Sequence, residues 1–441
     1  MKNLLRKLIK ALSSFRDGKY AGKMIGLFDF CRQVICDNDN TYAGQVHERM
    51  KLKNIIPAED KGVCHATLIE PTVKIKVRIV YPTGCAWNHI HSMYEAFFKD
   101  DRFQTYVLVR DAIEFTSVLN RYGCKYVTYN NYNLKDDCPD IVVATFYSAY
   151  EKELVFEGCR KYIGKVFAEI PNVVMNEKND DIHWQFVSRA YQYLPPDYWL
   201  VDPLVYNSLV KYVEPSKLVK MGSPQFDEIF EEVGKDHPWP VSWNKLKGKK
   251  VFLWATDHGL NESYPTNGFT IDLYLGEMLR YFREKPDCAL IFRPHPEFVR
   301  ELNRHGNFWN MDEIMKLKAY MASTPNVVWD ETHDYCRAYD ACDALIVDAN
   351  CSITCSFLIT GKPICRLLRT DINEWLISSE LYECYYYAKG FEECISYINM
   401  ICEGKDPKSA VRLEGGKQAI LHFDGKNGER IKEFVASKAI V

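Results

Sequence analysis

The sequence predicts an α/β protein built from two doubly wound parallel sheets, which follow one another along the chain. The 441 residues exceed what one ordinary hydrophobic core organises, so two domains are expected. From residue 73 onward, short apolar runs alternate with helical segments, a pattern typical of parallel sheets covered by helices. The alternation begins again near residue 250, after a segment rich in proline and lysine at 237–250.

The first half of the chain carries the signals of one sheet. Alternating or continuous apolar runs predict strands at 73–82, 105–110, 125–130, 140–146, 165–171, 198–203 and 218–222. Helical spacing predicts helices at 90–98 and 112–122.

The second half repeats this plan. Strands, some running into loops, are expected at 251–259, 289–296, 326–332, 344–348 and 363–368. A helix is expected at 271–282. The tail from residue 391 is expected to be helical, with breaks near 404–407 and 415–417 and a last helix at 429–439.

These elements divide the chain into four expected parts. An N-terminal helical segment occupies 1–65, a first domain 70–215, a second domain 216–425 and a C-terminal helix 426–441. Two doubly wound domains in tandem imply a cleft between them. Ligands of such sheets bind beyond the carboxyl ends of the strands, so residues just after strands are the candidates for function.

The first twenty residues have the pattern of a basic amphipathic helix. Apolar residues recur at helical spacing, and lysine or arginine fills the rest of the turn; the apolar set is Leu5, Leu8, Ile9, Leu12 and Phe15. Such a helix can lie in the headgroup region of an anionic membrane, which predicts peripheral contact with the inner face of the cell membrane. The alternative is a helix that packs its apolar stripe on the protein body.

The composition of the whole chain is typical of soluble globular proteins. Hydrophobic residues make up 47% and charged residues 26% of the chain, and the net charge of -3 does not favour a nucleic-acid binder. Sixteen cysteines occur without a C-x-x-C pair, and many stand in apolar runs, so reduced thiols in a cytoplasmic protein are expected. No apolar stretch is long enough to span a bilayer, and no signal peptide is recognised.

The stretch ALIFRPHPEF, residues 289–298, is the first candidate site. Arg293 offers a permanent cation and a planar donor fork suited to phosphate oxygens. His295 follows between Pro294 and Pro296, which restrict the backbone on both sides. A histidine held in this way suits proton transfer or the binding of an anionic group. The alternative is a loop histidine that caps the following helix.

The second candidate is GSPQFDEIF, residues 222–230. Gly222 permits a tight backbone, and Ser223 can cap a helix that has Pro224 at its first position. Free N–H groups at such a helix start can bind phosphate. A plain helix cap is the simpler interpretation.

DANCSITCSFLITGKPI, residues 348–364, is the third candidate. A strand ends at Asp348, and Asn350 and Ser352 stand where a helix is expected to open, so backbone N–H and hydroxyl groups there suit a diphosphate. Gly361 is expected to end that helix. The alternative interpretation is wholly structural: strand, cap, helix and glycine stop.

Common catalytic and metal motifs are missing from the sequence. It contains no P-loop, G-x-G-x-x-G, H-E-x-x-H or G-x-S-x-G, and no convincing metal-ligand spacing, so neither a metal nor a cofactor is predicted. His89 and His91 are two residues apart and would not face one site on a helix.

Together, GSPQFDEI, the strand ending in RPHP and the segment ending in TGKPI resemble the CDP-glycerol glycerophosphotransferases of teichoic-acid and related polymer synthesis. WNHIHSMYEAFFKDDRFQTYVLV resembles the opening of that family's acceptor domain, and the match covers most of residues 75–435. The resemblance implies a GT-B architecture of two Rossmann-like domains, a CDP-linked donor held by the C-terminal domain, and a lipid-linked or polymeric acceptor at the membrane.

By position, His295 matches the histidine that the family is thought to use on the donor's phosphates. Gly222, Ser223 and Pro224 match the loop at the head of the family's donor domain. Asp348 and Ser352 match an aspartate and a serine near the diphosphate. The family's His-Gly pair, its usual catalytic base, has no counterpart in 166–179. Glu169 is the nearest ionisable substitute there, and His183 lies further along.

The leading hypothesis is therefore a transferase. An acceptor hydroxyl would attack the phosphorus next to glycerol or a similar polyol, with CMP leaving, while Arg293 and His295 neutralise the diphosphate and Glu169 takes the proton. One alternative is a glycosyltransferase of the same shape that uses a nucleotide sugar in surface polysaccharide synthesis. Another is a catalytically inactive nucleotide-binding partner protein, which the absent His-Gly pair favours.

Overall fold

The computed structural model describes residues 74–440, all within one compact unit of the chain. Gaps in this description fall at 83–86, 146–150, 152, 172–179, 236, 258–268, 296–297, 299–310, 333–334, 350, 352 and 371–380. The expected N-terminal helices lie outside the described residues. Within the described part, none of the helices combines the length and apolarity needed to cross a bilayer.

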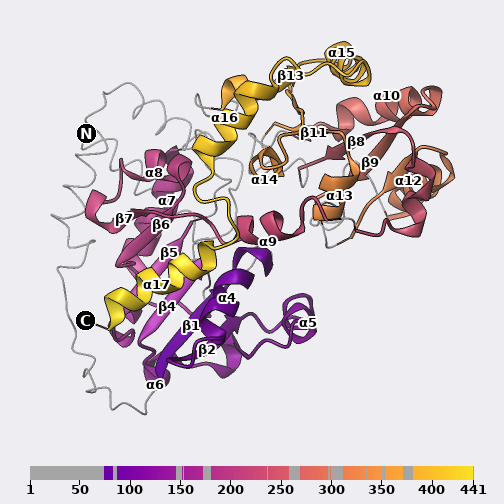
Figure 1. Ribbon diagram of the computed structural model, residues 1–441. Coiled ribbons are helices and arrows are strands. Elements are labelled where there is room, and N and C mark those ends of the chain that lie inside the picture. The colour runs from indigo at the N-terminus through magenta and orange to yellow at the C-terminus, as the bar shows by residue number, and fades with distance from the viewer. Residues whose placement is uncertain are drawn as a thin grey trace, which may run out of the picture. The chain divides into compact units, whose positions relative to one another are not determined.

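The first half forms a seven-stranded parallel sheet with the order β3-β2-β1-β4-β5-β6-β7 (Figure 1). Its strands are β1 (Ile75–Tyr81), β2 (Phe103–Val109), β3 (Tyr126–Thr128), β4 (Ile141–Thr145), β5 (Val166–Ile170), β6 (Tyr198–Val201) and β7 (Leu218–Lys220). The order turns back on either side of β1, as a doubly wound sheet requires. Every strand predicted in this half is confirmed within a few residues.

Helices lie between most of these strands along the chain, as connections between parallel strands require. They are α4 (His91–Phe98), α5 (Ile113–Arg121), α6 (Leu134–Asp137), α7 (Asp180–Tyr193) and α8 (Pro203–Leu209). The central strands are apolar on both faces because helices cover both. Val77 and Ile79 pack with Phe97 on one side, and Val80 packs with Leu108 on the other.

The second half forms a six-stranded parallel sheet with the order β10-β9-β8-β11-β12-β13. Its strands are β8 (Lys250–Ala255), β9 (Cys288–Arg293), β10 (Val327–Trp329), β11 (Ala344–Asp348), β12 (Ile364–Leu367) and β13 (Tyr386–Ala388). The short edge strand β13 is absent from the sequence prediction; its three residues pair with Cys365–Leu367. Such a brief run gives no periodicity to detect.

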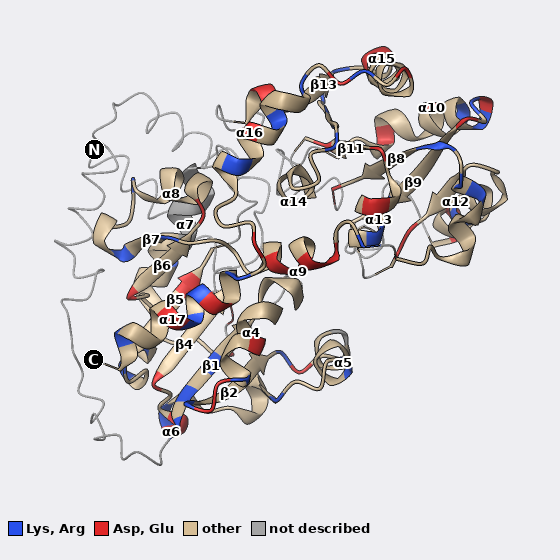
Figure 2. Cartoon of the chain, viewed as in Figure 1, with Lys and Arg blue, Asp and Glu red and all other residues tan. Residues whose placement is uncertain are grey.

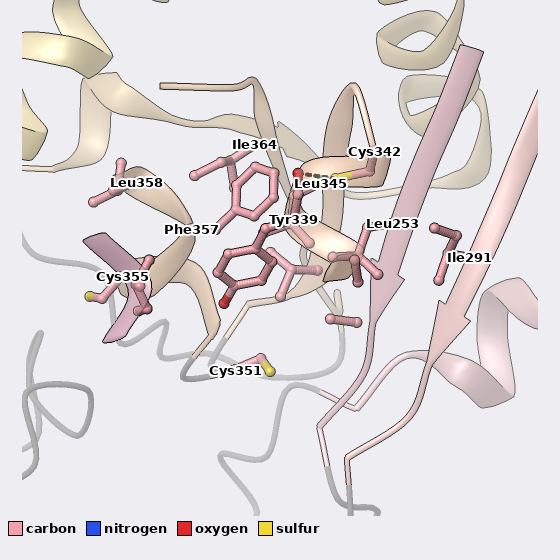
Figure 3. Packing of buried hydrophobic residues seen from close by; sticks show 14 of the residues in the cluster. Leu253, Ile291, Tyr339, Cys342, Leu345, Cys351, Cys355, Phe357, Leu358 and Ile364 are labelled. Carbon is pink, nitrogen blue, oxygen red and sulfur yellow. Dashed lines mark hydrogen bonds between the residues drawn. The ribbon is translucent and has the colours of Figure 1, made fainter. Parts of the chain in front are cut away.

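The helices of this half are α9 (Gln225–Glu232), α10 (Ile271–Glu284), α12 (Met311–Ser323), α13 (Cys336–Ala341), α14 (Ile353–Leu358), α15 (Phe391–Cys402) and α16 (Ser409–Ala419). On one face of the sheet, Leu253, Ile291 and Leu345 pack against Tyr339 and Phe357 (Figure 3). Packing of this kind buries the apolar faces of α13 and α14 against the strands.

One expected helix break is wrong. The sequence predicts an interruption at 415–417, but α16 continues through both of its glycines. A Cβ at Gly415 would lie 2.3 Å from the sulfur of Cys384, and one at Gly416 would lie 3.6 Å from the carbonyl oxygen of Leu358. The glycines therefore serve close packing of the helix against its neighbours, and that gain outweighs their low helix propensity.

The last helix, α17 (Asn427–Ala439), begins two residues before its expected start and returns to the first sheet. Ile431, Val435, Ala436 and Ala439 are buried in the same core as β1 and α4. In Figure 1 this yellow helix lies beside the indigo and magenta elements, although it is the last part of the chain.

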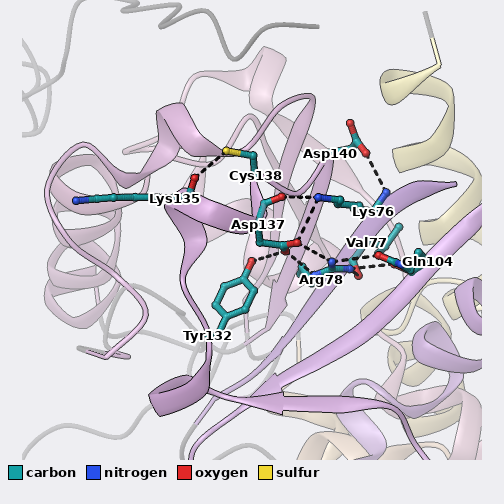
Figure 4. A network of polar contacts seen from close by, with 9 residues as sticks. All are labelled: Lys76, Val77, Arg78, Gln104, Tyr132, Lys135, Asp137, Cys138 and Asp140. Carbon is teal, nitrogen blue, oxygen red and sulfur yellow. Dashed lines mark hydrogen bonds and ion pairs between the residues drawn. The ribbon is translucent and has the colours of Figure 1, made fainter. Parts of the chain in front are cut away.

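A buried ion pair ties α6 to β1 and β2 (Figure 4). The Arg78 guanidinium donates to both carboxylate oxygens of Asp137, at 2.7 and 2.9 Å, and to the carbonyl oxygens of Val77 and Gln104 at 3.0 Å. Tyr132 also donates to Asp137, at 2.9 Å. This bidentate geometry satisfies an arginine that is only 5% exposed.

Replacement of Asp137 by asparagine should therefore destabilise the fold in a pH-dependent manner. Burial raises the pKa of Asp137, but hydrogen bonds and charge from Arg78 outweigh it, so the pKa lies below its usual value. The stabilisation is present above the unfolded-state pKa of about 3.9 and is lost as the pH falls through the folded-state value. We expect a loss of about 3 kcal/mol at neutral pH, from denaturant midpoints, that shrinks in acid.

Asp136→Asn is the matched control, because Asp136 is exposed. Among the described residues, the hydrogen bond that its carboxylate accepts comes from the exposed side chain of Asn133. This variant should change stability by less than about 0.5 kcal/mol. Equal losses in the two variants, or a loss for Asp137→Asn that does not change with pH, would contradict the proposed ion-pair contribution.

A second buried carboxylate joins three distant segments. Asp227 in α9 accepts hydrogen bonds from the Ser92 hydroxyl at 2.7 Å and from the backbone N–H groups of Asn427 and Gly428 at 2.9 and 2.8 Å. Its charge thus stands at the start of α17, where the helix dipole favours an anion. Figure 2 shows that α9 is acidic over much of its length.

The close approach at this junction predicts a strong effect of Gly428→Ala. A Cβ there would lie 2.4 Å from the backbone carbon of Ser92, so α4 and α17 would have to separate. We expect a loss of about 3 kcal/mol, measured by urea unfolding. Gly276→Ala in α10 is the control: a Cβ there meets nothing within 4 Å, so the variant should be neutral or up to about 1 kcal/mol more stable. Similar midpoints for the two variants would refute the argument.

Candidate functional site

The candidate site is the carboxyl edge of the second sheet. Strands β10, β9, β8 and β11 are neighbours and run parallel, so the residues that follow them meet at one edge. Arg293 is in register with Ala255, which is in register with Val347. The loops after these strands therefore bring together Thr256 and Asp257, Arg293 to His295, Asp330 to Thr332, and Asp348.

Arg293 is built into this edge by its neighbours. Its guanidinium forms an ion pair with the fully buried carboxylate of Asp330 and donates to the hydroxyl and carbonyl oxygens of Thr332, at 3.3 and 2.7 Å. The N–H of Thr332 in turn donates to Asp330 at 2.9 Å. Asp330 compensates the charge of Arg293, and the pair holds the loop after β10 against β9. Sequence reasoning had not identified this partner.

His295 follows at the start of a tight turn. Pro294 is buried, His295 is half-buried, and its carbonyl oxygen accepts from the N–H of Phe298 at 2.8 Å. Phe298 is fully buried and packs against Phe292 and Trp329. This aromatic anchor, together with the fixed φ of Pro294, holds the backbone of His295 in place. The second flanking proline lies outside the described residues.

Asp348 lies inside the edge. Its carboxylate accepts from the N–H of Asp257 at 2.8 Å and from the hydroxyl of Thr270, and its side chain has no exposed surface. It therefore joins β11 to the loops after β8. Burial raises the pKa of Asp348 to about 8. The predicted ligands Asn350 and Ser352 lie outside the described residues, and α14 begins at Ile353.

Gly222, Ser223 and Pro224 are buried against the C-terminal return of the chain. A Cβ at Gly222 would lie 2.0 Å from the Asn427 side-chain oxygen, and the Ser223 carbonyl oxygen accepts from the Asn427 amide at 3.2 Å. Helix α9 starts after Pro224 without a side-chain cap. The expected capping by Ser223 is wrong, because the N–H of Phe226 donates to the carbonyl oxygen of Ser223, at 3.1 Å, and not to its hydroxyl. The proposed phosphate-binding role of this loop stays a prediction.

Glu169 lies in the first sheet. It occupies the fourth position of β5, in register with Ala144 and Trp199, and has no exposed surface. The side chain of His183, the other ionisable group considered there, lies outside the described residues. The assignment of Glu169 as proton acceptor stays a prediction.

A contact between the two halves of the chain was missed by the sequence analysis. Asn88, in a short 3-10 turn after the central strand β1, donates to the hydroxyl of Tyr335, which follows β10. Beside it, burial lowers the pKa of His89 to about 4, so its imidazole is neutral near pH 7. The signal that could have located it is the run WNHIH, whose polar residues follow a strand end.

Among the residues that the structure describes, no cluster of three or more histidine, cysteine or acidic side chains is placed to hold a metal ion. Because the described charged side chains at the edge of the second sheet are largely paired, the groups that it offers to a ligand are hydroxyl, imidazole and backbone groups.

No protein-family model matches the chain, and no curated protein sequence matches it. Solved structures do match. MnaA from S. aureus, in a structure with UDP, has a TM-score of 0.56 at 13% identity, over 82% of this chain and 96% of that one. The UDP-GlcNAc 2-epimerase of Methanocaldococcus jannaschii, in complex with UDP-GlcNAc and UDP, has a TM-score of 0.53 at 12% identity, over 82% and 99%. The Neisseria meningitidis enzyme, bound to UDP-GlcNAc, reaches 0.50 at 14% identity, over 82% and 100%.

These similarities extend over both sheets and establish the fold: two Rossmann-like α/β domains of the GT-B type. The predicted fold class is confirmed. At 12–14% identity the likeness is one of architecture, and the resemblance to glycerophosphotransferases gains no support beyond that level.

The buried state of Asp348 predicts a pH-dependent stability. Because its folded-state pKa of about 8 lies above the unfolded-state value, its contribution is fully present below about pH 3.9 and is lost as the pH rises through about 8. Asparagine does not titrate in this pH range, so the Asp348→Asn variant lacks this pH-dependent contribution. The stability of the wild type relative to this variant should therefore fall between pH 5 and 9, as measured by denaturant midpoints. Parallel pH profiles for the two proteins would show that Asp348 ionises normally.

Proposed function

We propose that this chain is an enzyme that binds a nucleotide diphosphate-linked substrate at the carboxyl edge of the second sheet. The observation that carries the proposal is the gathering of strand-end groups there, with the half-buried His295 held between buried anchors. Ligands of doubly wound sheets occupy this position. The likeness to structures determined with UDP and UDP-GlcNAc supports a nucleotide-linked substrate.

Among such substrates, we favour a nucleotide sugar. An acceptor hydroxyl would attack the anomeric carbon of the sugar, the bond from that carbon to the diphosphate would break, and the nucleoside diphosphate would leave with the developing charge. His295 and the backbone N–H groups near Asn350 and Ser352 would stabilise that charge, and Arg293 would hold the loop after β10 in position. Glu169 would receive the proton of the acceptor.

Transfer of glycerol phosphate from a CDP-linked donor is the second candidate. The specific observation in its favour is the ordered set of GSPQFDEI, RPHP and TGKPI in the second half of the sequence. In that reaction the hydroxyl attacks phosphorus and CMP leaves. In both reactions we propose a polymeric or lipid-linked acceptor, approached with the help of the basic amphipathic segment 1–20 at the inner face of the membrane.

A ligand screen with His295→Ala tests this proposal. We expect UDP or UDP-GlcNAc to raise the thermal unfolding midpoint of the wild type more than CDP or CDP-glycerol does. The variant should bind the preferred nucleotide about tenfold more weakly by calorimetry, and it should lose about a hundredfold in turnover once an acceptor is found, because charge on the leaving diphosphate is no longer stabilised.

His237→Ala is the matched control. His237 is also half-buried, but it lies away from the strand ends. Its Nε2 atom is 3.0 Å from the backbone carbonyl oxygen of Glu232. This variant should bind like the wild type. A preference for CDP-glycerol, with CMP released, would replace the first candidate by the second. Nucleotide binding without turnover on any acceptor tried would favour the inactive partner protein, and no binding of any nucleotide would refute the proposal.

A further inference from the structure

Two cysteine thiols meet at the end of the second sheet opposite to the candidate site. The sulfur atoms of Cys288 and Cys402 are 3.1 Å apart, although 114 positions separate them along the chain. Cys288 is the first residue of β9, and Cys402 is the last residue of α15. Arg293, by contrast, ends β9 at the carboxyl edge.

Regular structure holds both residues in place. The N–H of Cys288 donates to the Lys285 carbonyl oxygen at 3.1 Å, and its own carbonyl oxygen accepts from the Asn326 amide at 2.7 Å. The Tyr281 hydroxyl donates to the Asn399 side chain at 2.8 Å, one helical turn before Cys402, which fixes α15 against α10. Rigid elements on both sides therefore bring the two thiols together.

The two thiols differ in exposure. Cys402 is exposed, the only one of the described cysteines in that class, whereas Cys288 is 6% exposed. Burial, followed by the contact with Cys402, raises the pKa of Cys288 to about 12, so it stays protonated at neutral pH. An oxidant in solution would therefore meet Cys402 first, with Cys288 next to it as the resolving thiol.

We propose that Cys288 and Cys402 form a reversible oxidation site, in which a peroxide converts the dithiol into an intrachain disulfide between β9 and α15. The Cys402 thiolate attacks one peroxide oxygen; the O–O bond breaks, and Cys402 becomes a sulfenic acid. The Cys288 sulfur then attacks the Cys402 sulfur, forming the S–S bond and releasing water. In total, two thiols and one hydrogen peroxide give one disulfide and two waters. The sulfur atoms must approach by about 1 Å to reach the bonding distance of about 2.05 Å.

The test uses the reduced full-length chain, with equimolar hydrogen peroxide as the oxidant. Remaining thiols are blocked with N-ethylmaleimide, and non-reducing peptide mass spectrometry maps any link. We expect one peptide pair joining Cys288 to Cys402, lighter than the two separate peptides by two hydrogen atoms and cleaved by dithiothreitol. The disulfide closes a long loop, so the oxidised wild type should also unfold at a higher temperature than the reduced protein.

Two variants sharpen the result. Cys402→Ser should abolish both the link and the thermal shift, and because this residue is exposed the variant should fold. Cys138→Ser, at a half-buried cysteine that follows α6, should retain both. Oxidation of Cys402 to sulfinic acid while Cys288 stays a thiol would overturn the proposal. A link from either residue to a different cysteine, or a thermal shift that persists in Cys402→Ser, would overturn it equally. Nucleotide binding plays no part in these readouts, so they are independent of the proposed function.

Discussion

The arrangement of this molecule depends on one buried carboxylate. Asp227 accepts hydrogen bonds from Ser92 in α4 and from the first two N–H groups of α17, while Phe226 and Ile229 of the same helix enter the core of the second sheet. Hydrogen bonds to an ionised acceptor are stronger than those between neutral groups. A single anion therefore joins the start of the C-terminal helix to both halves of the chain. Gly428 permits the close approach that these bonds require.

Ionisable side chains at the strand ends are likewise engaged by partners within the protein. Asp330 neutralises Arg293, and Asp348 is engaged by Thr270 and the backbone of Asp257. Groups that the sequence offers as ligands for phosphate thus build the loops around the edge: the charge of Arg293 is paired, and the buried carboxyl group of Asp348, whose pKa is raised, is hydrogen-bonded. In the proposed function, binding of an anion at this edge would then fall to groups without a full compensating charge, such as an imidazole or backbone N–H groups.

Much of the fold could be predicted from local patterns. The apolar runs of β1, β4, β9 and β11 are long enough to identify buried parallel strands, and their alternation with helices indicates the doubly wound plan. Contacts between residues that are far apart in the sequence leave no such pattern of apolar residues. The approach of Asn427 to Gly222, the pairing of Arg293 with Asp330 and the meeting of Asn88 with Tyr335 depend on tertiary packing, which one-dimensional periodicity does not encode. The positions of His295 and Arg293 at a strand end were predictable, whereas their partners were not.

The two candidate reactions place the same demand on the second sheet. Negative charge grows on the leaving diphosphate when a sugar carbon is attacked, and on CMP when phosphorus is attacked, so the proposed anion-binding edge would serve either reaction. The reactions differ on the side of the acceptor, where the attacking oxygen must lose its proton within reach of a base. Glu169 in β5 is fully buried beside Ala144 and Trp199. A base in that position would work only on an acceptor that reaches into the first sheet.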